Sequence, residues 1–193
     1  MNTFFTSDTH FSHKNIIRYC SRPFASVEEM DATMIQRWNE KVKPGDRVFH
    51  LGDFCFGQRE QVLAMTRKLN GHIVLIVGNH DSIGQPSNYG FAEKHQLLTA
   101  KINGTYITMC HYAMRIWERS HYDSWHIFGH SHGTLEAIGK SWDVGVDNNG
   151  FAPLEFEELK KIMDLQPHNL NWLERLKGFD PKEYEAYRQT EMS

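Results

Sequence analysis

Five stretches of the sequence place imidazole, carboxylate or amide side chains directly after a short apolar run. One such stretch is easily accidental, because polar residues are common where strands end. Five of them, each with groups that bind metal ions or transfer protons, predict one shared site where the side chains converge. The stretches are Asp8-Thr9-His10, Gly52-Asp53, Gly78-Asn79-His80-Asp81, His111 and Gly129-His130-Ser131-His132.

The donor set favours two divalent ions over one. Two carboxylates, four or five imidazoles and an amide exceed the roughly three protein ligands plus water of a catalytic ion. Nitrogen and oxygen donors without thiolate suit Mn, Fe, Co, Ni or Zn, and we expect Mn to serve best in vitro. Two ions about 3.5–4 Å apart need a bridging carboxylate, and Asp53, on the middle predicted strand, is the natural bridge. Such a pair clamps a phosphoryl group and makes hydroxide available at neutral pH.

The central stretch follows the apolar run 73–77. Its β-branched and aliphatic residues are typical of a strand buried on both faces inside a parallel sheet. Gly78 suits the sharp bend at the end of that strand. Ligands of open α/β sheets bind outside the carboxyl ends of the strands, where Asn79 and His80 would lie.

The first half of the chain predicts alternating strands and helices. Ser26 and Glu29 have the spacing of a capping box at the start of the first long helix. A β-α-β-α-β order with short connections predicts right-handed crossovers and a parallel sheet. Strands are expected at 3–7, 47–51 and 73–77, and helices from Ser26 up to Pro44 and over about 59–69.

The second half is expected to be rich in strands and mostly antiparallel. Asn103-Gly104, between runs 98–102 and 105–110, is a two-residue hairpin signal. We expect one domain, residues 1–193, with a core over about 3–156 and a helical C-terminal extension over about 157–193. Further strands are expected at 125–128 and 142–147, and a surface loop at 82–88.

Composition limits the class of protein and its partners. The chain has 193 residues, 40% of them hydrophobic, which is enough to bury a full core. A formal net charge of −3 offers no basic face for duplex nucleic acid, so metal or a local basic pocket must hold an acidic substrate. Cys20, Cys55 and Cys110 lack a C-x-x-C pair, which is typical of reduced thiols, and we expect a cytoplasmic protein. No apolar run approaches the ~20 residues of a membrane helix, so no membrane partner is expected.

Taken in chain order, the motifs resemble those of the calcineurin-like metallophosphoesterases over roughly residues 3–156. The motifs are Asp-x-His, Gly-Asp, Gly-Asn-His-Asp, a lone His and Gly-His-x-His. The segment from Ser7 to His13, together with Arg22-Pro23-Phe24, further resembles the small single-domain bacterial and phage branch. The resemblance implies an α/β fold, a β-sandwich of two mixed sheets flanked by helices (four layers, α/β/β/α), with a dinuclear site at the strand ends.

The resemblance also implies ligands for each metal ion. Asp53 would be shared between the two ions. The ligands of the first ion would be Asp8, His10 and His132, and those of the second Asn79, His111 and His130.

His80 would be catalytic and not a ligand, because the resemblance implies that this imidazole faces the substrate. It would protonate the leaving oxygen or stabilise the transition state. Relatives with Gly-Asp-x-x-Asp use the second Asp to orient this His, but Phe56 occupies that position here. A backbone carbonyl or Asp81 would have to orient His80 instead.

Three further residues are candidates for a role at the same site. Arg22 can fork onto a substrate phosphate, since a guanidinium matches phosphate geometry. The alternative is a surface arginine at the entry of the next helix. His13 follows the Asp-x-His motif closely enough to line the cleft and contact substrate. Asp147 can accept a hydrogen bond from a ligand histidine.

Three classes of function remain open from the sequence. The favoured one is a metal-dependent hydrolase of small phosphoesters (phosphodiesters, cyclic nucleotides or phosphomonoesters) that acts through attack of a metal-bound hydroxide. A nuclease or protein phosphatase on the same core would want a basic track or added docking surface, which 193 residues of net charge −3 do not offer. A non-catalytic metal-binding scaffold would be expected to have lost His80 or a ligand.

Overall fold

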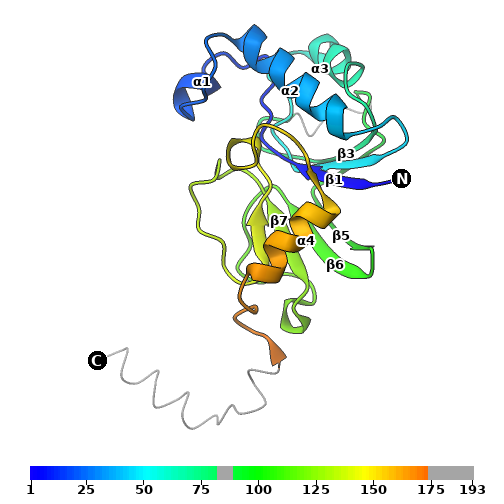
Figure 1. The fold of residues 1–193 in the computed structure, drawn as a ribbon, viewed down its shortest axis with the longest axis vertical. Coiled ribbons are helices and arrows are strands. Elements are labelled where there is room, and N and C mark those ends of the chain that lie inside the picture. Colours follow the sequence, from blue (N-terminus) through cyan, green and yellow to red (C-terminus); the bar gives the residue numbers. More distant parts are fainter. Residues whose placement is uncertain (82–88, 174–193) are drawn as a thin grey trace.

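Two β-sheets lie face to face with helices around them in the computed structural model (Figure 1). The structure describes residues 1–81 and 89–173. The surface loop predicted at 82–88 and the part of the predicted helical extension from residue 174 onward lie outside the described residues.

The first sheet has the strand order β4-β3-β2-β1-β9. Its first four members are parallel to their neighbours, and β9 pairs antiparallel with β1. The predicted parallel half is therefore confirmed, while β4 and β9 were too short for hydrophobic periodicity to reveal. The bounds are β1 (Thr3–Thr6), β2 (Arg47–His50), β3 (His72–Ile76), β4 (Glu93–His95) and β9 (Leu154–Glu155).

The second sheet has the order β5-β6-β7-β8. The predicted hairpin is confirmed, because β5 and β6 pair antiparallel on either side of Asn103-Gly104. The prediction of a mostly antiparallel second half is wrong, since β6–β7 and β7–β8 are parallel pairs. The bounds are β5 (Leu97–Ile102), β6 (Thr105–Cys110), β7 (Trp125–Phe128) and β8 (Ser141–Asp143).

The connection between β6 and β7 explains the parallel pairing. Residues 111–124, with the 3-10 helix η1 (Ser120–Tyr122), return the chain across the outer face of the sheet. Trp117 of this connection is buried, with its ring centre 5.2 Å from that of His126 in β7. The backbone N–H of Met114 donates to His126 Nε2 at 3.0 Å. A return path of this kind lets two consecutive strands run in the same direction.

The strand predicted at 142–147 is shorter than expected and ends at Asp143. Gly145 forms an isolated β-bridge with Ser7, and residues 146–148 form the 3-10 helix η2 (Val146–Asn148). The turn moves Asp147 out of the sheet and toward the ends of β1 and β7, as described below.

Alternate residues of the first sheet belong to two separate hydrophobic cores. Phe4 and Val48 pack with α2 and α3 on one face, while Phe5 and Phe49 pack against the second sheet on the other. This alternation is the period of two that places successive side chains on opposite faces of a strand. Burial on both faces accounts for the continuous apolar run of β3.

The helices flank the sheets as the predicted fold class requires. Ser26 caps α2 (Val27–Lys41), since its hydroxyl accepts from the N–H of Glu29 at 3.2 Å. α2 and α3 (Arg59–Thr66) lie across the outer face of the first sheet (Figure 1). α4 (Phe156–Leu165) buries one face in the core between the sheets, and a short helix, α1 (Ile16–Tyr19), precedes α2. No helix within 1–81 and 89–173 is long and apolar enough to span a membrane.

The ends of several strands come into van der Waals contact at glycines. A Cβ on Gly129 would lie 2.0 Å from Ser7 Oγ and 2.3 Å from Asp8 Oδ2. A Cβ on Gly78 would lie 2.3 Å from Asp53 Oδ1. The glycines beside the chemical residues are therefore required for close approach of the strand ends.

We expect Gly129→Ala to lower the free energy of unfolding by about 1–3 kcal/mol, the usual cost of overpacking. Urea unfolding in the presence of a chelator measures this without a metal contribution. Gly45→Ala is the matched control, because a Cβ there meets nothing within 4 Å. Equal unfolding midpoints for the two variants would contradict the close packing at Gly129.

Candidate metal centre

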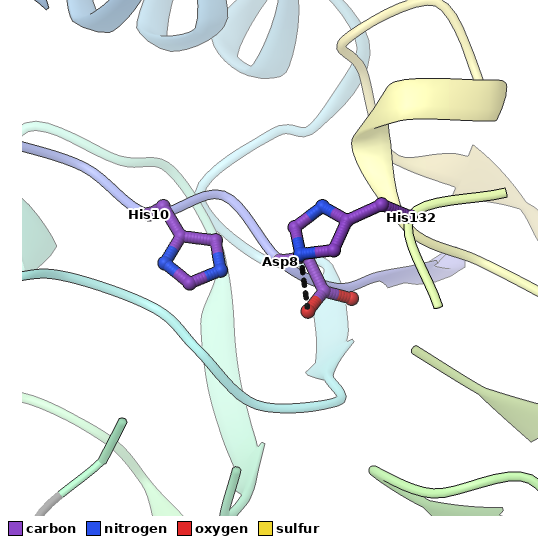
Figure 2. Close-up of side chains that lie close together, drawn as sticks. All are labelled: Asp8, His10 and His132. Carbon is purple, nitrogen blue, oxygen red and sulfur yellow. Dashed lines mark ion pairs between the residues drawn. The ribbon is translucent and has the colours of Figure 1, made fainter. Parts of the chain in front are cut away.

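Two groups of metal-ligating side chains lie at the strand ends. The first cluster is Asp8, His10 and His132, and the second is Asp53, His111 and His130. Within each cluster, one ligand atom per residue lies within 4.8 Å of the others. Figure 2 shows the first cluster, where His132 Nε2 faces Asp8 Oδ1 at 3.9 Å and His10 lies beside them. The first cluster contains the three residues of the first expected set, and the second contains His111 and His130 of the second set together with Asp53, which was expected to be shared.

Asp53 lies between the clusters. Its Oδ2 is 3.5 Å from His10 Nε2 and 3.6 Å from His111 Nε2. Its other oxygen, Oδ1, accepts from the backbone N–H of His80 at 2.9 Å. One carboxylate oxygen therefore faces a nitrogen of each cluster, which is the arrangement that a bridging carboxylate needs.

Asn79 adjoins the second cluster. Its Oδ1 is 3.0 Å from His111 Nε2, so all seven residues predicted as ligands meet at one place. The hydroxyl of Tyr112 is 3.5 Å from the same amide oxygen. Tyr112 was not predicted, although its position directly after His111 was the available signal.

Five of the seven predicted ligand residues have a left-handed backbone. Non-glycine residues adopt this conformation at a cost of roughly 1–3 kcal/mol each, and only when surrounding structure enforces it. Here it turns the side chains at the strand ends toward a common point. The φ angles are 56° for Asp8, 48° for His10, 55° for Asp53, 66° for His130 and 49° for His132.

Two buried atoms of the first cluster have no hydrogen-bond partner within the described part of the chain. They are Asp8 Oδ1 and His10 Nε2. Burial raises the pKa of Asp8 to about 7 and lowers the pKa of His10 well below its usual value. Buried polar atoms normally have partners, so these two lone-pair donors fit a divalent ion as the missing one.

Outer hydrogen bonds orient one histidine of each cluster. His132 Nδ1 donates to Asp147 Oδ2 at 2.7 Å, which confirms the predicted contact, and His111 Nδ1 donates to the carbonyl of Leu51 at 2.7 Å. Each bond leaves Nε2 to face its cluster. Burial favours a higher pKa for Asp147, but hydrogen bonds from His132 and Arg22 outweigh it and lower this pKa below its usual value.

Arg22 is not available to a substrate. The residue is 4% exposed, and its guanidinium donates to Asp147, to the carbonyls of Asp8 and Thr9, and to the sulfur of Met30. These contacts use all five N–H groups of an arginine. The structure therefore supports neither the predicted contact with a substrate phosphate nor a surface position.

His80 is exposed beside the clusters, with its ring centre 5.4 Å from that of His10. Asp81 does not orient its imidazole, contrary to one of the two expected alternatives. The Asp81 carboxylate instead accepts from the backbone N–H groups of Asp53, Phe54 and Gly78. Asp81 thus ties the loop after β2 to the loop after β3.

His13 lies next to the first cluster, with its Nδ1 3.4 Å from His10 Nδ1. Its ring stacks on Phe56 with the centres 4.5 Å apart and the planes 16° from parallel. Phe56 is 53% exposed. The residue that replaces the second Asp of the family motif therefore forms part of an aromatic wall beside the clusters.

Cys20 approaches the first cluster from outside. Its sulfur lies within 4.8 Å of ligand atoms of His132 and Asp147. Burial, with the nearby Asp147 carboxylate, raises the pKa of the Cys20 thiol to about 11. Burial therefore favours the protonated form of this thiol at neutral pH. Sequence spacing gave no sign of this position.

Residues 1–146 match the family model for the calcineurin-like phosphoesterase superfamily domain, and the chain belongs to this superfamily. The chain is 34% identical over 167 residues to an uncharacterized protein, MJ1445, of Methanocaldococcus jannaschii, covering 82% of this chain and 89% of that one. It is 39% identical over 84 residues to the gene 66 protein of Mycobacterium phage L5, covering 42% and 40% of the two chains.

A solved structure shares the fold. It is the protein of unknown function AQ665 from Aquifex aeolicus, with a TM-score of 0.67 and 24% identity. The match covers 83% of this chain and 98% of that one. The family is one of metal-dependent phosphoesterases, which agrees with the two candidate metal-ligand clusters.

We expect Asp53→Asn to weaken the binding of two ions at once, because the carboxylate faces both clusters. A bound ion stabilises the folded state by roughly 2.7 kcal/mol at a hundredfold excess over its Kd. Most of the Mn-dependent rise in melting temperature should therefore be lost in this variant. Elemental analysis and thermal melting with and without chelator measure both effects.

Asp164→Asn is the control for the loss of one carboxylate, since Asp164 is exposed on α4. Full occupancy by both ions in Asp53→Asn would rule out the bridging role. A wild-type melting temperature that is the same with and without chelator would count against a metal centre.

Proposed function

We propose that this chain hydrolyses small phosphoesters at a dinuclear metal centre formed by the two clusters. The observation that carries the proposal is the position of Asp53 Oδ2, 3.5 Å from a nitrogen of the first cluster and 3.6 Å from one of the second. Membership of the metal-dependent phosphoesterase family supports it. Phosphodiesters, cyclic nucleotides and phosphomonoesters are the candidate substrates.

The ions are proposed to be Mn, Fe, Co, Ni or Zn, because the donors are nitrogen and oxygen. When bound, they would supply Lewis-acid stabilisation of the phosphoryl oxygens and activation of the attacking water. Asp53 would serve both ions. The other residues proposed to hold them are Asp8, His10 and His132 for one, and Asn79, His111 and His130 for the other.

His80 is the proposed catalytic side chain. Its backbone is fixed by the bond from its N–H to Asp53 Oδ1, while its imidazole is exposed on the open side of the clusters. From there it can donate a proton to the leaving oxygen or hydrogen-bond a phosphoryl oxygen. His13, whose ring centre lies 6.4 Å from that of His80, is proposed to contact the rest of the substrate.

The surroundings of the clusters favour a small substrate with an organic group on the phosphate. Phe56 and Tyr112 are 53% and 48% exposed beside the first and second clusters. Exposed aromatic faces suit the organic part of a phosphodiester or nucleotide. All five N–H groups of Arg22 are used within the protein, so the proposed ions would compensate the negative charge of the phosphate.

We expect higher kcat/KM on bis-p-nitrophenyl phosphate or a cyclic nucleotide than on a phosphoprotein. The physical reason is that the exposed aromatic faces of Phe56 and Tyr112 beside the clusters suit a small organic group, while a net charge of −3 gives no general attraction for a phosphoprotein. Assays with Mn at matched substrate concentrations measure the ratio, with p-nitrophenyl phosphate included as the monoester. Equal or better turnover of a phosphoprotein would overturn this preference.

We expect His80→Ala to keep its metal ions and to lose roughly 10²–10⁴ in kcat on alkyl phosphoesters, the usual contribution of a general acid. The loss should be smaller on p-nitrophenyl esters, because that leaving group departs as a stable anion. Steady-state kinetics on both substrates measure the difference, and elemental analysis measures the metal content.

His72→Ala is the matched control, since His72 is an exposed histidine at the start of β3, far from the strand ends that carry the clusters. An equal loss on both ester types would indicate stabilisation of phosphoryl charge by His80 and not of the leaving oxygen. Loss of metal in His80→Ala would indicate that His80 is a metal ligand and would contradict its assignment as a catalytic residue that does not bind metal.

A further inference from the structure

A buried arginine lies behind the first cluster, and the chemistry proposed above does not use it directly. The Arg22 side chain has no exposed area in its ion pair with Asp147, where Nε donates to Oδ1 at 2.7 Å and Nη2 to Oδ2 at 2.8 Å. Removing a guanidinium from water is expensive unless its charge and all its donors are compensated.

Two acceptors of Arg22 are backbone carbonyls of the segment that carries Asp8 and His10. Nη2 donates to the carbonyl of Asp8 at 2.7 Å, and Nη1 donates to the carbonyl of Thr9 at 3.0 Å. These two residues begin the loop that presents Asp8 and His10, both with a left-handed backbone. Arg22 therefore holds the carbonyl groups of a strained loop that would otherwise relax.

Arg22 acts on the third ligand residue, His132, through Asp147. The Oδ2 atom that accepts from Arg22 also accepts from His132 Nδ1 at 2.7 Å. With Nδ1 donating, Nε2 of His132 keeps its lone pair and faces Asp8 Oδ1. A carboxylate behind a ligand histidine fixes the tautomer and the ring orientation.

Within residues 1–81 and 89–173, Arg22 makes no such bonds to the second cluster. The outer partner of His111 is the carbonyl of Leu51, and the hydrogen bonds that Arg22 donates end on residues 8, 9, 30 and 147. The first cluster is therefore expected to depend on Arg22, and the second is not.

We infer that Arg22 is a positioning residue that pre-organises the first metal cluster, through Asp147 to His132 and through the backbone of Asp8 and Thr9. The inference rests on the proposed dinuclear function. Lysine cannot replace arginine here, because an ammonium cannot reproduce the two parallel bonds to a carboxylate together with the bonds to two carbonyls.

Manganese titration of single-cluster proteins tests the inference without an activity assay. His111→Ala leaves the first cluster, and His132→Ala leaves the second. Adding Arg22→Lys to His111→Ala is expected to weaken Mn binding by roughly 10–100-fold, the usual effect of losing an outer partner. Adding Arg22→Lys to His132→Ala is expected to leave Mn affinity unchanged, although the same buried arginine has been replaced.

Electron paramagnetic resonance of the otherwise wild-type protein provides a spectroscopic readout. With two equivalents of Mn, the wild type should show a coupled pair of ions, and Arg22→Lys should show an isolated ion. Asp147→Asn should reproduce this change while leaving Arg22 in place. Arg37→Lys is the control, since Arg37 is an exposed arginine of α2 that donates to the carbonyl of Gly150.

Unchanged first-cluster affinity in both Arg22→Lys and Asp147→Asn would overturn the inference. Equal weakening of the two clusters by Arg22→Lys would overturn it as well, because that pattern indicates general destabilisation. Circular dichroism in the presence of a chelator shows whether Arg22→Lys folds. If it does not, the first-cluster Mn affinity of Asp147→Asn alone tests the inference. A wild-type protein that takes up fewer than two ions would instead contradict the proposed function, and the wild-type titration reveals this before any variant is compared.

Discussion

The site depends on the close approach of strand ends from two different sheets. Asp8 follows β1 in the first sheet and Gly129 follows β7 in the second, and a Cβ on Gly129 would lie 2.3 Å from Asp8 Oδ2. The same oxygen accepts from the N–H of His130 at 2.9 Å. The carboxylate of a candidate ligand thus also joins the two sheets. Metal chemistry and sheet packing are coupled here because they use the same few atoms.

The sequence was sufficient to predict the parallel sheet, the hairpin and the residues that converge. These features are local: an apolar run, a turn dipeptide and polar residues at strand ends each have a short-range signal. The parallel pairing of β6 with β7 was not predictable in this way. It depends on the path of residues 111–124, where Trp117 packs on His126 across the sheet. That contact is a tertiary one, and periodicity within either segment does not encode it.

Arg22 shows the same limit of prediction from local sequence within the site. An arginine near a predicted metal-ligand motif is chemically suited to phosphate, and spacing alone does not reveal whether its side chain turns outward. Its partner Asp147 is 125 residues away in sequence, on a turn that the sequence had suggested was a strand. Asp81 is similar, since its carboxylate is already engaged by three backbone N–H groups and does not reach the imidazole of His80. Polar residues beside a site are often part of its support.

Charge balance connects these observations. Asp8 and Asp53 are 0% and 2% exposed, and burial raises the pKa of Asp8 to about 7. Arg22 compensates Asp147 but makes no side-chain contact with either of these two carboxylates. Desolvated carboxylates favour protonation unless positive charge is close. A pair of divalent ions would stabilise these carboxylates and would also attract a phosphoester to a chain of net charge −3. The burial of carboxylates without nearby positive charge is costly in the protein alone, but it suits the site to metal ions and so to its proposed substrate.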